Sequence, residues 1–162
     1  MRTLVLMVIV ITGSLLPPPS GLQGQSTVER LQGAWRVVDL GQTGSPGAAS
    51  GSTQPGLLLF AGDHYSYTLV TRPRPDMPQG LSSPEELLTV WNPFTANAGT
   101  FEVSGDTMIR RPVVAKNPSA MGQGIYNEYT FRLSADTLWI TTVGTETGAA
   151  RNPRTVRYER AR

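Results

Sequence analysis

The sequence contains no cysteine and only one histidine among its 162 residues. Without cysteine, disulfide bridges, thiol catalysis and lipid attachment through a cysteine are excluded, so packing alone must hold the fold together. A single histidine, His64, leaves too few nitrogen ligands for a typical zinc or other transition-metal site. A Ser-His-Asp arrangement would have to recruit this same residue, which follows Asp63 in a predicted turn. We therefore expect no metal, no haem or other cofactor, and no nucleophilic catalysis.

The sequence also lacks a large excess of either sign of charge. The 14 Lys and Arg residues face 12 Asp and Glu residues, and the basic residues form no run. Lys116 is the only lysine. Because a basic patch is the usual mark of a nucleic-acid surface, nucleic acid is not an expected partner. Asp63, Asp106 and Asp136 all fall in predicted turns, where a short carboxylate bonds local backbone, so we expect no catalytic carboxylate pair.

No apolar run is long enough to span a bilayer comfortably. The longest one, residues 3–11, follows the positively charged Arg2 and is ended by a triple proline at 17–19. This order is typical of a secretory signal peptide. We predict that residues 1–26 are a signal peptide cleaved before Thr27, an uncleaved N-terminal anchor being the alternative. Residues 27–162 would then form one domain without an integral membrane segment, exported to the periplasm or the extracellular space.

One helix is predicted in this domain. Ser83 can cap it, Pro84 suits its first position, and Glu86 completes the capping pattern. Leu87, Leu88 and Trp91 then share one face at helical spacing, and we expect this face to pack against the domain.

Short apolar segments separated by turn signals make up most of the remaining chain. We predict eight strands, over residues 35–40, 57–60, 65–71, 99–103, 107–115, 125–133, 138–142 and 154–160. Tight turns between short strands favour an antiparallel meander, and closure into a barrel removes the exposed edges. The predicted fold is therefore all-β, an eight-stranded antiparallel barrel with one short helix.

The order of several short motifs resembles the bacterial lipocalin-like domain family, a branch of the calycin barrels. They are LQGAWRV (31–37), PGLLLF (55–60), GTFEV (99–103), FRL (131–133), DTLWI (136–140) and YER (158–160). The resemblance implies a barrel that can hold a small ligand. It also implies that Arg160 packs across Trp35 and closes one end of the barrel.

Strand phase identifies candidate ligand-binding residues. Asn127, Tyr129 and Phe131 belong to the apolar phase of their strand, and Tyr65 and Tyr67 share one face of theirs, so these side chains should point inward.

Alternation leaves the strand at 107–115 open, because either Arg110 or Arg111 could face the interior. The resemblance favours Arg110 inside. Since an unpaired buried arginine is costly, an inward Arg110 implies an anion, a carboxylate neighbour or water beside it.

These patterns favour a binding protein over an enzyme. We expect the barrel to bind a small apolar or amphiphilic molecule, which could be anionic. Two alternatives remain open: an isomerase- or lyase-like calycin that uses Tyr129 as an acid and Arg110 as a clamp, or a packed barrel without ligand that serves as an interaction module.

Overall fold

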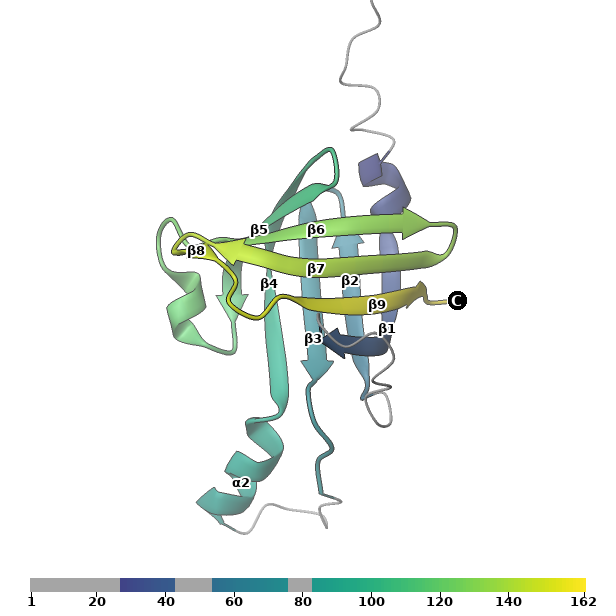
Figure 1. Ribbon diagram of the computed structural model, residues 1–162. Helices are drawn as coiled ribbons and strands as arrows, with labels where there is room; N and C mark the ends of the chain where they lie inside the picture. Colours follow the sequence, from purple (N-terminus) through teal and green to yellow (C-terminus); the bar gives the residue numbers. More distant parts are fainter. Residues whose placement is uncertain (1–26, 43–53, 76–82) are drawn as a thin grey trace, which may run out of the picture.

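The computed structural model describes residues 27–42, 54–75 and 83–162 (Figure 1). The predicted signal peptide lies outside the described residues. Within these three ranges, no helix is long and apolar enough to cross a membrane.

Nine antiparallel strands form one sheet that closes on itself. Neighbouring strands pair in the order β6-β5-β4-β3-β2-β1-β9-β7, and β6 pairs with β7 to close a ring of eight. The short β8 pairs with β7 at the end of this order. The predicted eight-stranded barrel is thus confirmed, with one extra strand. The strands are β1 (Gly33–Gln42), β2 (Gly56–Ala61), β3 (His64–Val70), β4 (Phe94–Ser104), β5 (Thr107–Ala115), β6 (Asn127–Ser134), β7 (Thr137–Thr145), β8 (Gly148–Ala149) and β9 (Arg154–Arg160).

Most strand ends lie within two residues of the predicted ones, and the largest difference is at the start of β4. Strand β4 begins at Phe94 rather than at Gly99, because its first half pairs with β3 from Phe94 onward despite few apolar residues. Between β5 and β6, the chain forms a short 3-10 helix, η1 (Pro118–Met121), where we predicted a loop.

The hydrophobic core lies inside the barrel. Alternate residues of each strand point inward, and the largest fully buried side chains are Trp35, Leu58, Met108, Leu138 and Tyr158 together with Leu31 from the helical turn before β1. Burial of this apolar surface is the main favourable contribution to folding.

The helical turn at residues 27–31 lies at one end of the barrel. The Trp35 indole Nε1 donates a 2.7 Å hydrogen bond to the Leu31 carbonyl oxygen. Gln32 donates from Nε2 to the Gly62 carbonyl and accepts from the Gly62 N–H, which ties this end to the β2–β3 turn. We call this the closed end.

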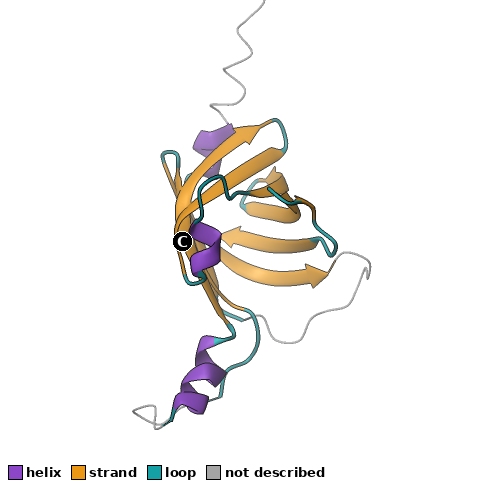
Figure 2. Ribbon diagram, turned by 90° about the vertical axis from the view of Figure 1, so that its left-hand side faces the viewer, coloured by secondary structure: helices purple, strands orange, loops and turns teal. Residues whose placement is uncertain are grey.

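The predicted helix is present as α2 (Pro84–Trp91), with both hydrogen bonds of the Ser83–Glu86 capping box. Its expected packing is wrong. The helix projects away from the barrel between β3 and β4 (Figures 1 and 2), and none of its residues is buried. Leu87, Leu88 and Trp91 each remain about half exposed, at 47%, 52% and 48%.

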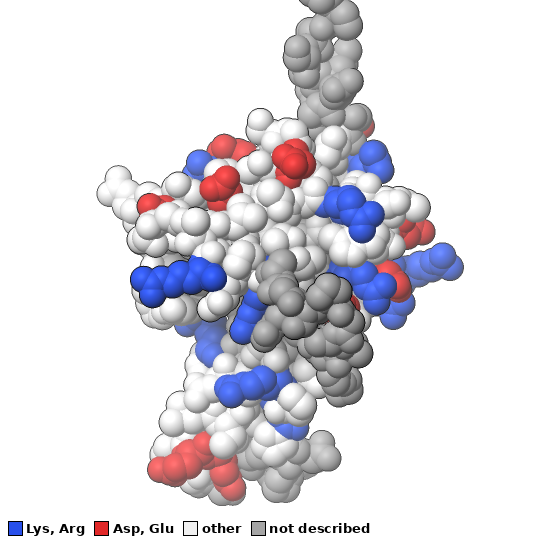
Figure 3. Space-filling view, viewed as in Figure 1, with Lys and Arg blue, Asp and Glu red and all other residues white. Residues whose placement is uncertain are grey.

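Lys116 fastens the C-terminal end of α2 to the barrel. Its Nζ donates to the carbonyl oxygens of Trp91 and Phe94, at 2.5 and 2.8 Å, and lies 5.0 Å from the Trp91 ring centroid. Elsewhere, positive and negative side chains are interspersed over the face seen in Figure 3.

Candidate ligand site inside the barrel

Strand β5 carries the most unusual interior residue, Arg110. Met108, Arg110 and Pro112 form the buried phase of β5, whereas Arg111 points outward and pairs with Glu102 at 2.7 Å. The question that alternation leaves open is therefore answered by the structure, which places Arg110 inside. Only 3% of its surface is exposed.

Three aromatic rings surround the Arg110 guanidinium. Its Cζ lies 4.7 Å from the ring centroid of Tyr129, 5.1 Å from that of Tyr65 and 5.4 Å from that of Phe60. These distances are within the range of cation–π attraction, which grows when the cation is removed from water. The rings come from β6, β3 and β2, so aromatic side chains of three strands surround the charge.

The hydrogen-bonding capacity of Arg110 is mostly unused. Its Nε donates to the Met108 sulfur at 3.3 Å, a weak acceptor. Its Nη2 is buried and has no hydrogen-bond partner within the described parts of the chain. The ion pairs found there involve Arg36, His64, Arg111 and Arg160, but not Arg110.

Three tyrosine hydroxyls lie within electrostatic reach of this charge. Burial raises the pKa of Tyr65 to about 12, and the nearby Arg110 charge offsets part of that rise. Burial likewise raises the pKa of Tyr67 and Tyr158, again opposed by Arg110. All three phenols are therefore neutral at physiological pH and can donate hydrogen bonds.

The remaining predicted site residues lie around Arg110. Asn127 is its direct cross-strand partner on β6 and is half-buried. Tyr129 is the partner of Met108, and Tyr67, Tyr129 and Phe131 pack against the buried core. The structure thus brings Tyr65, Tyr67, Tyr129 and Asn127 to the same region as Arg110.

The sequence analysis missed two members of this region. Phe60 lies 4.7 Å from Phe101, centroid to centroid, and faces Arg110, whereas Tyr158 is almost fully buried on β9. Both could have been found from strand phase. Phe60 lies on the same face of its strand as Leu58, and Tyr158 lies on the same face as Val156.

The closed end is built around Arg160. Its Cζ lies 4.2 Å from the Trp35 ring centroid, and the two residues are cross-strand partners. Its Nη1 and Nη2 donate to the Gln32 and Arg30 carbonyl oxygens at 2.8 and 2.7 Å. Gly33 adopts a φ of +106°, and a Cβ there would lie 3.3 Å from the Arg160 Nη1, so glycine gives the arginine room.

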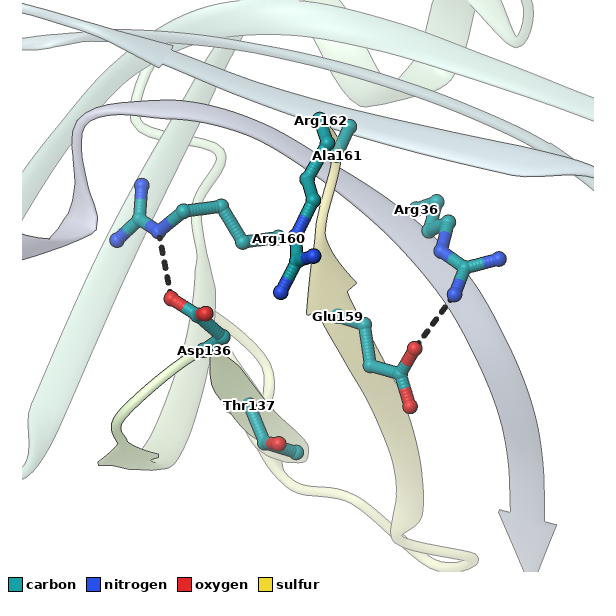
Figure 4. A pocket seen from close by; sticks show the side chains of 7 residues that line it. All are labelled: Arg36, Asp136, Thr137, Glu159, Arg160, Ala161 and Arg162. Atoms are coloured by element: carbon teal, nitrogen blue, oxygen red, sulfur yellow. Dashed lines mark hydrogen bonds and ion pairs between the residues drawn. The ribbon is translucent and has the colours of Figure 1, made fainter.

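An open groove of about 540 Å³ lies beside this closure (Figure 4). Its charges mostly pair with each other, Arg36 with Glu159 at 2.6 Å and Arg160 with Asp136 at 3.5 Å. Because these pairs already satisfy the charges, the groove fits barrel closure better than ligand capture. It is lined by Arg36, Asp136, Thr137, Glu159, Arg160, Ala161 and Arg162.

Comparisons with known proteins give two solved structures of low similarity and one family model. Two crystal structures of the fluorescent protein UnaG, the wild type and a point mutant, are 14% and 13% identical to this chain, with TM-scores of 0.39 and 0.37. Each comparison covers 83% of this chain and 99% of the UnaG chain, but the similarity is too low to transfer any property. No curated protein sequence matches. A family model described as a lipocalin-like domain matches residues 32–161. That span includes every strand of the barrel, and the chain therefore belongs to the family of lipocalin-like domains.

Proposed function

We propose that this protein is exported and that its barrel binds a small apolar or amphiphilic molecule in its interior. An eight-stranded barrel is wide enough either to be filled by its own side chains or to hold one small ligand. The family and the closed barrel are consistent with the second arrangement.

One observation carries the proposal: the interior holds a buried charged group whose hydrogen-bonding capacity the protein itself leaves largely unused. Buried polar groups in folded proteins are nearly always hydrogen-bonded. Here the buried Arg110 Nη2 has no hydrogen-bond partner within the described residues. The surrounding wall is aromatic, which is typical of a ligand pocket with a few convergent polar groups.

The experiment is a titration with N-phenyl-1-naphthylamine, a neutral probe that fluoresces in apolar surroundings. We expect saturable binding of one probe per barrel. Native mass spectrometry of protein purified from its own host should also show a retained small molecule.

A barrel filled by its own side chains would not bind the probe. Absence of saturable probe binding, together with a bare protein mass, would favour the interaction module without ligand. Conversion of the retained molecule into a product during incubation would favour the enzyme.

A further inference from the structure

We infer that the interior site selects amphiphiles with a single negative charge, a carboxylate in the natural ligand, and that this anionic head lies against Arg110. The inference rests on the proposed function, because it names the ligand class of the same site.

The first argument is charge balance. Arg110 is 97% buried, the complement of its 3% exposure, and arginine keeps its proton at any physiological pH. Buried charges are normally paired, because an isolated ion loses its hydration without compensation. No described carboxylate forms an ion pair with Arg110, and its hydrogen bond within the described residues goes to a thioether sulfur. A bound anion would supply the missing partner.

The second argument concerns the number of charges on the ligand. Arg110 is the only charged residue that is buried among the described residues. The phenols near it are neutral, because burial raises the pKa of Tyr65, Tyr67 and Tyr158. They can donate hydrogen bonds to an oxyanion without repelling it. One cation with neutral donors matches one negative charge, whereas a dianionic phosphate would leave a second buried charge unpaired.

The third argument gives the orientation of the ligand. Phe60 and Tyr65 flank the β2–β3 turn, and that turn is bonded to Gln32 at the closed end. Arg110 contacts both rings, so it lies in the closed half of the barrel. The head group must therefore enter first, and the apolar tail extends toward the end that carries α2 and η1.

The test uses two probes with the same ring skeleton. 1-Anilinonaphthalene-8-sulfonate carries one negative charge, and N-phenyl-1-naphthylamine is its neutral counterpart. Arg110→Met keeps an apolar stem but removes the charge and the donors. Arg111→Met is the matched control, since it makes the same change in net charge at the next residue, which faces outward.

We expect Arg110→Met to weaken binding of the sulfonate by about tenfold or more, because hydrogen bonds to charged groups are the strong ones. Binding of the neutral probe should be unchanged. Arg111→Met should alter the affinity for neither probe. The affinity of Arg110→Lys for the sulfonate should lie between those of the wild type and Arg110→Met, because an ammonium keeps the charge but lacks the planar set of donors of a guanidinium.

The possible failures are distinguishable. Equal loss of both probes in Arg110→Met, or no loss of the sulfonate, would overturn the anion site while leaving the container proposal in place. Failure of the wild type to bind either probe would overturn the container itself.

If Arg110→Met does not fold, the wild type alone still decides. Dodecanoate should then bind about tenfold tighter than dodecanol at pH 8, and equal affinities would overturn the inference.

Discussion

Arg160 contributes to closure through an aromatic ring and two backbone carbonyls at once. Its guanidinium lies over Trp35 and donates to the Gln32 and Arg30 carbonyl oxygens. We expect Arg160→Ala to lower the free energy of unfolding by about 1–3 kcal/mol, since the cation–π contact and the charged hydrogen bonds are lost together. Denaturant titration followed by tryptophan emission measures this loss of stability.

Arg162→Ala is the control for this change, because Arg162 lines the same groove but has neither the ring contact nor these hydrogen bonds. The control should match the wild type. An Arg160→Ala protein with an unchanged denaturation midpoint would contradict the closing role.

The interior tyrosines make stability depend on pH in the alkaline range. Burial raises the pKa of Tyr65 to about 12 and also raises that of Tyr158. An unfolded chain loses these protons near pH 10, whereas the folded protein keeps them. Below pH 10 both states are protonated and stability is flat. Above it, the free energy of unfolding should fall by about 1.4 kcal/mol per pH unit for each of these tyrosines.

Urea unfolding at pH 9, 10 and 11 measures this slope. Tyr65→Phe should reduce it by the contribution of one tyrosine. The same stability at pH 9 and pH 11 would show that the phenols ionise freely in the folded protein.

At the scale of elements, β4 depends on a glycine at an irregular position. The register between β4 and β5 shifts between Ala98 and Gly99, and a Cβ on Gly99 would lie only 1.9 Å from the Arg111 carbonyl oxygen. We expect Gly99→Ala to destabilise the protein by about 3 kcal/mol or more, because only backbone movement can relieve the clash. Thermal unfolding followed by circular dichroism measures the loss.

Gly41→Ala is the matched control. A Cβ there would meet the Thr155 carbonyl oxygen at 3.5 Å, an ordinary contact. Its melting temperature should stay close to that of the wild type, and equal melting temperatures for the two variants would contradict the close approach at Gly99.

Helix α2 should behave as a separate unit. Ser83→Ala removes an N-cap, which typically costs a helix about 0.5–2 kcal/mol. Since α2 has no buried residue, this cost should appear as local fraying rather than as loss of the barrel. Amide exchange of residues 87–91 should become faster while the melting temperature stays unchanged. A clear fall in melting temperature would mean that α2 is coupled to the barrel after all.

The success of sequence-based prediction differs among these elements for physical reasons. The strands of the second half and the capping box of α2 were predictable, because alternation and capping are local patterns. The packing of α2 was not, since a hydrophobic face does not say whether anything covers it. The orientation of β5 was also open to sequence alone, because Arg110 and Arg111 occupy opposite faces with apolar neighbours on both. Tertiary pairing with β4 and β6 decides it.

At the scale of the whole molecule, export remains a prediction. The short apolar run after Arg2 and the triple proline at 17–19 motivate it. N-terminal sequencing of protein from the cell envelope or the medium should find a first residue between Leu22 and Thr27. Recovery of chains that still begin at Met1 in a membrane pellet would favour the uncleaved anchor.

The fastening of α2 has a practical consequence, because Lys116 is the only lysine of the chain. An amine-reactive dye would attach to Lys116 and to the α-amino group of the chain, and peptide mapping would distinguish the label at the junction of α2, β4 and β5 from the terminal one. Acylation would also remove the ammonium that donates to the Trp91 and Phe94 carbonyl oxygens. The reaction rate of the Lys116 amine therefore reports how often these two hydrogen bonds open, without any engineered handle.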